Sequence, residues 1–440
     1  MRKNKEQRKG VHLMKQRDIS LRGKIIYSVY LRNHTPEGTF AALEGDLDRI
    51  KALGADIIWL LPIHPIGVLH KKGDLGCPYS IRDYRGVNPE YGTLDEFRHL
   101  VDEIHARGML CLIDVVYNHT SHDSVLREQH PEWFFRKPDG SFGNRYGDWT
   151  DVIDLDYDNP DLWRYQIDTL VQWAAIVDGF RCDVASCVPA AFWEQAVAEV
   201  AAINPDAIWL AESVYTGHVQ FARECGYPVA TDADLYRAFD MEYPYDVQDY
   251  FDRYVSGEGK LSDYMNMLTY QEHILPSDYI KVRFLENHDT PRASHRFPDT
   301  DIMRNWLSFV YFQKGPTLLY GGQEWQNTEY CTLFYKAVFE RDPAKDVTPY
   351  MTRLGEIKKN LLPVDADFSA KADDDTDIVT AYLTKRGTKF VGVFSMHGEA
   401  ADAKVDAPDG VYTNEIDGES VTVKKGVVRS QGKPMIFQVK

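Results

Sequence analysis

Acidic side chains stand at the ends of several short apolar runs in this sequence. Asp114 lies within one such run, Asp183 and Glu212 close two others, and Asp289 follows a fourth. Arg181 lies two residues before Asp183. A single polar residue at the end of a strand is ordinary. Strands that end in Asp, Glu and Asp, with Arg and His close by, indicate a shared site instead.

Carboxyl groups arranged in this way can cleave a glycosidic bond. In retaining glycosidases one carboxylate is the nucleophile and a second carboxyl group, about 5 Å away, donates the proton. Arg181 would lie on the same side of its strand as Asp183 and would lower the pKa of that carboxyl group. Glu212 follows the apolar residues 208–211, and burial near other carboxylates would raise its pKa, as a proton donor requires. We therefore expect a retaining glycoside hydrolase.

The elements that must position these residues alternate between apolar runs and amphipathic helical patterns. One predicted helix begins with the capping box Thr93-Leu94-Asp95-Glu96 and ends at Gly108. About eight strand and helix units predict an α/β fold, a closed (β/α)₈ TIM barrel whose strand ends meet at one mouth. An open doubly wound sheet is the alternative. The candidate strands are 25–30, 57–62, 109–116, 179–183, 207–212, 229–235, 280–285 and 317–320.

Two segments interrupt this alternation. Residues 120–156 are polar, aromatic and glycine-rich, which is typical of a functional excursion at a barrel mouth. From residue 362 onward, short alternating runs separated by turn signals predict a C-terminal β-sandwich domain. The expected organisation is an N-terminal tail (1–20), a catalytic barrel (21–361) that carries the excursion (120–156), and the β domain (362–440).

Four segments resemble the signature motifs of the α-amylase superfamily, glycoside hydrolase family 13, in the family's order. They are Asp-Val-Val-Tyr-Asn-His (114–119), Gly-Phe-Arg-Cys-Asp (179–183), Ala-Glu (211–212) and Glu-Asn-His-Asp (286–289). The resemblance covers nearly the whole chain and extends to maltodextrin-acting α-amylases, cyclodextrinases and oligo-glucosidases. It implies that Asp183 is the nucleophile, Glu212 the general acid/base, and Asp289 a third carboxylate that holds sugar hydroxyls. It also implies four substrate-binding residues, Tyr79, His119, Arg181 and His288.

Three departures from the family pattern concern the metal and the substrate. The resemblance associates calcium with Asn118, with acids of a larger excursion and with a position after the nucleophile, but here Ser186-Cys187 replace the usual Lys-His. We therefore expect no metal and no cofactor, with calcium the possible exception. Ser80 replaces the aspartate of exo-acting α-glucosidases, which favours action within oligosaccharides. Val184-Ala185 resemble cyclodextrin- and pullulan-cleaving members, which leaves the linkage open between α-1,4 and α-1,6.

The predicted substrate is a malto-oligosaccharide or another starch-derived α-glucan, and α-1,4 bonds are the expected point of cleavage. An α-glucanotransferase or a sucrose-type glucosyltransferase is the first alternative, because both reactions share the covalent intermediate. A catalytically inactive sugar-binding or accessory protein is the second, and the intact Asp183, Glu212 and Asp289 oppose it. The motifs do not separate hydrolysis from transfer.

Composition limits the remaining partners. The 440 residues carry a formal charge of −17, which argues against nucleic acid or an anionic membrane. The sequence contains no run of about 18 apolar residues, so we expect no transmembrane helix. The basic N-terminus lacks the apolar core of a secretory signal. The six cysteines are scattered, as expected for free thiols in a reducing cytoplasm. Nothing in the sequence predicts the oligomeric state.

Overall fold

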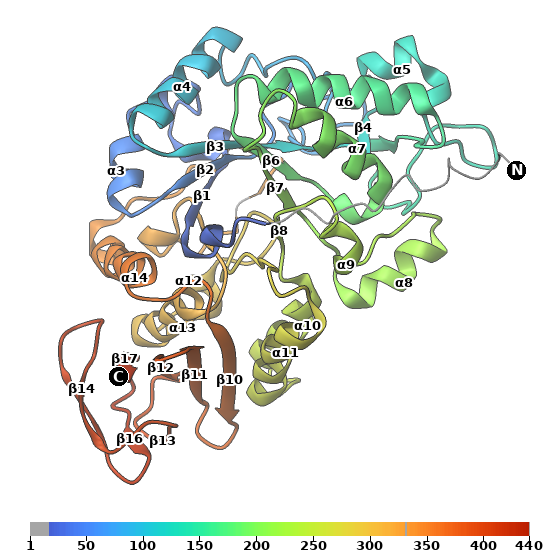
Figure 1. The fold of residues 1–440 in the computed structure, drawn as a ribbon. Helices are drawn as coiled ribbons and strands as arrows, with labels where there is room; N and C mark the ends of the chain where they lie inside the picture. The colour runs from blue at the N-terminus through green and yellow to red at the C-terminus, as the bar shows by residue number, and fades with distance from the viewer. Residues whose placement is uncertain (1–16, 331, 440) are drawn as a thin grey trace, which may run out of the picture.

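The computed structural model describes residues 17–330 and 332–439. A ring of strands surrounded by helices makes up most of the chain, and antiparallel strands form a separate layer at its C-terminal end (Figure 1). This confirms the predicted barrel with a C-terminal β domain. Most of the N-terminal tail expected over 1–20, and Cys331, lie outside the described residues.

Parallel strands form the barrel in the order β8-β7-β6-β3-β2-β1-β9. The two edge strands are joined through residues 280–283, where Lys281 bridges Glu242 and Arg283 bridges Thr317, both in parallel. This segment takes the remaining position and closes the ring, so the closed barrel is correct and the open sheet is wrong. The barrel strands are β1 (Ile25–Val29), β2 (Ile57–Leu60), β3 (Leu110–Val115), β6 (Gly179–Cys182), β7 (Ile208–Ala211), β8 (Met241–Glu242) and β9 (Thr317–Tyr320).

The strand predicted over 229–235 is wrong. Its last part is the short helix α9 (Asp232–Leu235), which begins with a capping box. The Thr231 side chain accepts a hydrogen bond from the Asp234 amide, and the Asp234 carboxylate accepts one from the Thr231 amide. The strand at this place in the barrel is β8, which has two residues and is too short to produce a recognisable sequence pattern.

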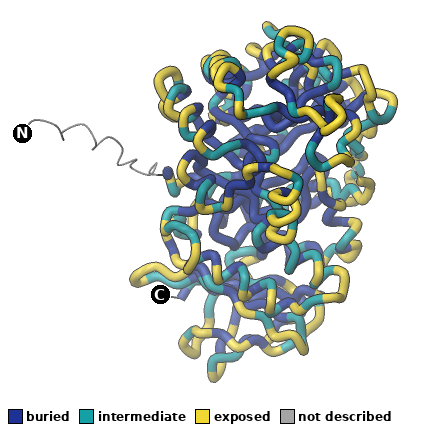
Figure 2. Tube along the Cα trace, turned by 90° about the vertical axis from the view of Figure 1, so that its right-hand side faces the viewer, coloured by how far each residue is buried: buried dark blue, intermediate teal, exposed yellow. Residues whose placement is uncertain are grey.

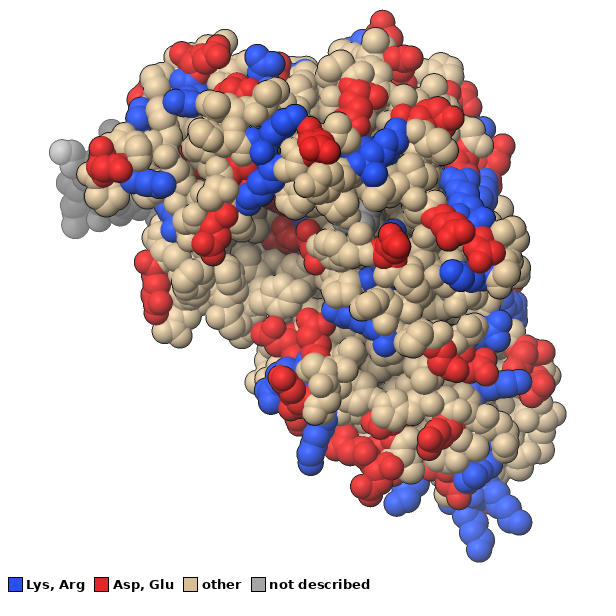
Figure 3. Space-filling model, turned by 180° about the vertical axis from the view of Figure 1, so that it is seen from behind, with Lys and Arg blue, Asp and Glu red and all other residues tan. Residues whose placement is uncertain are grey.

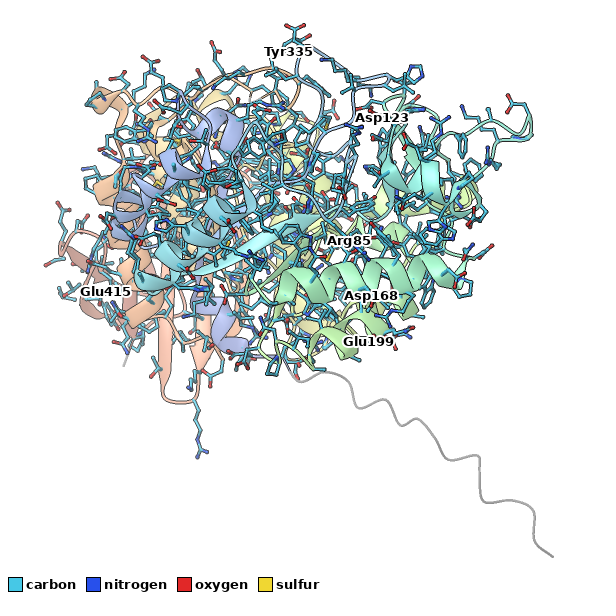
Figure 4. The ribbon with its side chains drawn as sticks, turned by 90° about the horizontal axis from the view of Figure 1, so that it is seen from above. Arg85, Asp123, Asp168, Glu199, Tyr335 and Glu415 are labelled. Carbon is cyan, nitrogen blue, oxygen red and sulfur yellow. The ribbon has the colours of Figure 1, made fainter. Side chains whose placement is uncertain are left out.

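Helices cover the outside of the ring, and local sequence signals explain several of their ends. The capping box predicted at Thr93 begins α4 (Leu94–Ala106), and Asn159 caps α6 (Pro160–Ala174). Arg164 contacts Asp168 on α6 and Glu199 on α7, both labelled in Figure 4. The other helices are α1 (Leu31–His34), α2 (Phe40–Glu44), α3 (Leu47–Ala52), α7 (Ala190–Val200), α8 (Thr216–Glu224), α10 (Tyr245–Val255), α11 (Leu261–Ile274), α12 (Ala293–Arg296), α13 (Thr300–Phe312) and α14 (Thr348–Asn360).

The excursion after β3 is built around a short antiparallel pair. β4 (His119–Ser121) pairs with β5 (Val152–Asp154), and α5 (Val125–Gln129) lies between them in the chain. The register places His119 opposite Asp154. Asp123, labelled in Figure 4, accepts a hydrogen bond from the Val68 amide in the loop after β2. The excursion is therefore attached to a neighbouring loop of the barrel mouth.

The C-terminal strands form one sheet and two ribbons. The sheet has the order β10-β11-β12-β17, and the ribbons are β13-β16 and β14-β15. Apolar side chains of the sheet and the ribbons share a small core, while Phe394 of β12 packs on Phe309 and Phe312 of α13. The strands are β10 (Asp367–Asp373), β11 (Ile378–Lys385), β12 (Thr388–Ser395), β13 (Asp402–Lys404), β14 (Gly410–Thr413), β15 (Ser420–Val423), β16 (Val427–Arg429) and β17 (Met435–Val439).

Burial follows this arrangement. Buried residues concentrate in the interior of the molecule, and exposed residues lie at its outer turns (Figure 2). Close packing also explains Gly179 at the start of β6, because a Cβ atom there would lie 2.1 Å from the carbonyl oxygen of Ile208. Within the described residues, every helix is too short or too polar to cross a lipid bilayer.

Candidate active site

The predicted site residues come together at the C-terminal end of the barrel strands. Arg181 lies on β6, with Asp183 directly after that strand, and Glu212 directly follows β7. All three are buried, although the two carboxylic acids keep slight exposure, 8% for Asp183 and 7% for Glu212. The surface seen in Figure 3 is hollowed left of its centre, and acidic side chains are visible inside the hollow.

Arg181 is the centre of the site. Its Nη1 lies 2.9 and 3.0 Å from the two carboxylate oxygens of Asp114 and 2.8 Å from Oδ1 of Asp183. Its Nη2 lies 2.8 Å from Oε1 of Glu212. Asp114 and Arg181 are register partners on adjacent strands, which explains their contact. One fully buried guanidinium therefore holds three carboxylates from three strands in a single group.

Tyr79 and His288 form the opposite part of the same group. The Tyr79 hydroxyl donates a hydrogen bond to Asp114 at 2.8 Å and lies 2.7 Å from Nε2 of His288. The two rings are stacked, with centroids 5.3 Å apart and an interplanar angle of 7°. His288 Nε2 is also 3.0 Å from Oδ2 of Asp289. Asp289 is the most open of the three predicted carboxylates, with its side chain 42% exposed.

His119 enters the site from the start of the excursion. Its Nε2 lies 4.0 Å from Oδ2 of Asp183, and its ring lies beside that of Trp149, with centroids 5.2 Å apart. Burial lowers the pKa of His119 to about 4, so the imidazole is neutral at neutral pH. All seven residues predicted from the sequence therefore lie in or at the edge of one buried group.

Burial changes the acidity of the central pair more than Arg181 does. It raises the pKa of Asp183 above the usual range of an aspartate, although Arg181 lowers that pKa and Asp114 raises it further. Burial also raises the pKa of Glu212, against the effect of Arg181 and together with that of Asp183. The expected net lowering for Asp183 is therefore wrong, because loss of hydration outweighs the guanidinium. Two buried carboxyl groups so close together favour sharing one proton.

The acidity of the outer pair follows from their mutual contact. Burial alone would raise the pKa of Asp289, but the adjacent His288 lowers it. Burial alone would likewise lower the pKa of His288, but Asp289 raises it. The contact with His288 thus favours the ionised form of Asp289, while burial favours the protonated form of Glu212.

Sequence reasoning missed the residues that frame Arg181. The rings of Tyr243 and Trp59 lie 5.4 and 5.3 Å from the guanidinium carbon. Tyr245 stacks on Tyr215, with centroids 4.4 Å apart, and its hydroxyl accepts a hydrogen bond from Asn287. Tyr243 and Tyr245 follow β8, the strand that the sequence pattern did not reveal. The segment Tyr-Pro-Tyr (243–245) was the sequence feature that could have pointed to these two rings.

The aromatic residues of the excursion divide into core and site. Trp133 and Phe134 are buried within the excursion, with 5% and 2% exposure, and serve as its core. Trp149 lies beside His119 and Tyr146 lies beside Trp149, with centroids 4.7 Å apart. Tyr215 covers Tyr245 at the mouth. Tyr146, Trp149 and Tyr215 are half-buried, unlike the core residues Trp133 and Phe134.

Two family models match the chain. The model described as the alpha amylase catalytic domain matches residues 23–359, and the bacterial alpha amylase C-terminal domain matches residues 369–437. A crystal structure of an alpha-amylase from Lactobacillus plantarum superposes with a TM-score of 0.92 at 41% identity, covering 96% of this chain and 100% of that one. A noncanonic maltogenic alpha-amylase from Thermotoga neapolitana gives a TM-score of 0.84 at 29% identity, covering 95% and 99%.

Curated relatives of another activity also match. An alpha-1,4-glucan:maltose-1-phosphate maltosyltransferase from Rhodospirillum rubrum is 33% identical over 273 residues, which are 57% of this chain and 36% of the relative. One from Streptomyces coelicolor is 36% identical over 200 residues, 41% of this chain and 30% of the relative. The match to this chain thus spans about a third of the length of these relatives.

Proposed function

Because this chain belongs to the alpha-amylase family, we propose that it is a retaining glycoside hydrolase that cleaves α-glucosidic bonds in malto-oligosaccharides or other starch-derived glucans. The observation that carries the proposal is the contact of Arg181 with both Asp183 and Glu212. One guanidinium contacts both carboxylates and so holds them in the same part of the site. In retaining enzymes the two carboxyl groups are about 5–5.5 Å apart. Inverting enzymes space theirs by about 6.5–9.5 Å.

In this proposal Asp183 is the nucleophile and Glu212 the proton donor. The Asp183 carboxylate forms a bond to the anomeric carbon while the glycosidic bond breaks, and Glu212 gives its proton to the departing oxygen. Water then attacks the glycosyl ester, Glu212 takes a proton from it, and the Asp183 carboxylate is released. The buried environment supports the protonated form of Glu212 at the start of this cycle.

The remaining site residues position the sugar. Asp289 is ionised and exposed enough to accept hydrogen bonds from sugar hydroxyls. Neutral His119 and His288 lie beside Asp183 and Asp289, respectively, and the hydroxyl contact of Tyr79 with His288 fixes the Tyr79 ring next to them. Asp114 anchors Arg181 and Tyr79.

Cofactor use and location complete the proposal. The mechanism above needs no metal and no redox group, since every step is carried by carboxyl groups and water.

Cytoplasmic location is supported by the cysteines, which are free thiols in the described part of the chain: Cys77, Cys111, Cys182, Cys187 and Cys225.

A transferase is the second candidate, because the curated relatives named above transfer maltosyl units. Both reactions use the same covalent intermediate and differ in whether water or a sugar hydroxyl attacks it. Hydrolysis and transfer therefore differ in the molecule that attacks the covalent intermediate, water or a sugar. Analysis of the products distinguishes them, whereas the roles of Asp183 and Glu212 are the same in both reactions.

Product analysis tests the proposal. The purified protein is incubated separately with maltoheptaose, pullulan, panose, cyclodextrin and sucrose, and with maltose 1-phosphate plus an α-1,4-glucan acceptor. Shorter sugars released first as the α-anomer support the retaining hydrolase, and the substrate consumed identifies the linkage. Longer products, or inorganic phosphate released with chain extension, would replace it by a transferase. No turnover in the whole panel, with Asp183→Asn as the blank, would favour the inactive binding protein.

A further inference from the structure

The junction between the excursion and the barrel brings together three segments. Asn118 precedes β4, Asp154 ends β5, and Cys187 follows the loop after Asp183. The Leu155 amide donates a 3.0 Å hydrogen bond to the Asn118 carbonyl, and the charge of Asp154 acts on the Cys187 thiol. These are the kinds of position with which the resemblance to α-amylases associates a calcium ion.

A positive charge of the chain itself already lies at this junction. The Arg145 amide donates a 2.8 Å hydrogen bond to Oδ2 of Asp154, and Nη1 of the same residue lies 3.3 Å from that oxygen. Nη1 also donates to the Leu155 carbonyl at 3.4 Å. The guanidinium lies over the rings of Phe135 and Tyr227, at 4.5 and 5.4 Å. The Asp154 side chain is fully buried and that of Arg145 is 16% exposed.

The other groups at the junction do not suit calcium, which takes six to eight oxygen ligands at about 2.3–2.6 Å. The Tyr227 hydroxyl donates to Asp154 at 2.8 Å, and the Asn118 amide nitrogen lies 3.2 Å from Nδ1 of His119. Burial raises the pKa of the Cys187 thiol to about 12, and Cys187 packs among apolar side chains.

The junction also has too few carboxylate oxygens for a calcium ion. Oδ1 of Asp154 is buried and has no hydrogen-bond partner among the described residues. Over that same part of the chain, no three side chains of the types His, Cys, Asp and Glu are grouped to hold a metal ion. One carboxylate oxygen beside a guanidinium is a poor calcium site, because the two cations would repel each other.

We propose that Arg145 replaces a metal ion at this junction, supplying from within the chain the charge that joins the excursion to the barrel. A buried carboxylate requires a partner, and Asp154 has Arg145 and Tyr227. Since Asp154 lies opposite His119 in the β4–β5 pair, the ion pair also fixes the strand that carries His119 toward Asp183. Arg145 is thus a positioning residue, and this last step rests on the proposed function.

The experiment compares the wild-type chain with Arg145→Met, Arg145→Lys and the control Arg136→Met. Arg136 is exposed in the same excursion, lies over Phe142 at 3.5 Å and donates to backbone carbonyls. Melting temperature is measured with EDTA and with millimolar calcium chloride, calcium binding by calorimetry on EDTA-treated protein, and kcat/KM with maltoheptaose.

The expected result is a wild-type melting temperature that is equal in EDTA and calcium, with no binding heat. Arg145→Met lowers the melting temperature and decreases kcat/KM by on the order of 10²-fold, since small misplacements of a site residue have effects of this size. Arg145→Lys restores part of both quantities, because it returns the charge. Arg136→Met leaves both unchanged.

Two results would overturn the proposal. The first is stoichiometric calcium binding that raises the wild-type melting temperature, and the second is an Arg145→Met variant that behaves like Arg136→Met. If Arg145→Met does not fold, the double variant Arg145→Met/Asp154→Asn removes both charges and should fold again; failure to recover also contradicts the pairing. Melting and calorimetry do not depend on the substrate, so an error in the proposed function would show only in kcat/KM.

Discussion

The backbone amide of Val184 donates a 2.7 Å hydrogen bond to the carboxylate of Glu212, joining the residue after Asp183 to the end of the neighbouring strand. Val184 adopts φ 36° and ψ 46°, a left-handed conformation that β-branched residues seldom adopt. Such strain persists where the surrounding structure enforces it, and it is concentrated at functional sites. Here it directs an N–H group at the proposed proton donor, so the placement of Glu212 depends on the loop that follows the nucleophile.

Glu212→Gln should separate proton donation from the rest of the mechanism. A positioned general acid contributes roughly 10²–10⁴-fold, so kcat for maltoheptaose should fall by that order. α-Maltosyl fluoride needs little protonation of its leaving group, and its first step should be much less affected. Burial raises the pKa of Glu212, and Glu212 must be protonated to act as the general acid. The wild-type activity should therefore decline as the pH rises through this raised pKa. The alkaline decline should disappear in the variant with the fluoride substrate; an unchanged profile would contradict the role of Glu212.

Asp183→Asn should abolish turnover of every substrate that the wild-type chain consumes. The amide cannot form the glycosyl ester, and its nearly equal size leaves the contact with Arg181 sterically possible. Steady-state rates and far-ultraviolet circular dichroism check the two parts of this prediction. Near-normal activity in a folded variant would remove Asp183 from the nucleophile role.

The same substitution should stabilise the fold, and more so at alkaline pH. Burial raises the pKa of Asp183 in the folded chain above its unfolded value, so its contribution to stability is present below the unfolded pKa and is lost as the pH rises through the folded one. The neutral amide of the variant carries no such dependence. The gain in melting temperature over wild type should therefore be larger at pH 8 than at pH 5. An equal gain at both values would show that Asp183 is not the titrating group.

Lys281→Met should destabilise the barrel. Lys281 is fully buried, and its Nζ lies 2.5 Å from Asp232, 2.9 Å from Glu242 and 3.3 Å from Asp246. Removing the cation leaves the buried carboxylate of Glu242 without its charged partner, which costs about 3–5 kcal/mol. Urea unfolding measures the change. The exposed Lys371→Met is the matched control and should change stability by less than about 0.5 kcal/mol; equal effects would mean that the cluster is solvated.

The fold was predictable to the extent that its elements are long and periodic. The capping box predicted at Thr93 begins α4, and the apolar run 109–116 contains β3. β8 was missed because two residues carry no period, and the strand expected over 229–235 was wrong because local capping by Thr231 and Asp234 favours a helix there. Tyr243 and Tyr245 were not predicted as site residues because they follow this missed strand.

The candidate site was predictable in its membership and not in its energetics. Ordered motifs identified Arg181 and Glu212 because residue type and order along the chain suffice to recognise them, and the family resemblance implied Tyr79. The acidity of Asp183 could not be read in the same way, since the sign of its shift depends on how completely the barrel removes water from it.

The sequence by itself thus predicted the alternating strands and helices, the C-terminal β domain and most of the residues at the mouth, because periodicity and capping are local properties of the chain and the motifs are recognised by residue type and order. Only the tertiary structure decided that one guanidinium joins Asp114, Asp183 and Glu212, that burial outweighs this guanidinium in setting acidity, and that Arg145 meets Asp154 at the junction. Charge interactions and hydration depend on distances between segments far apart in the chain, and folding alone creates those distances.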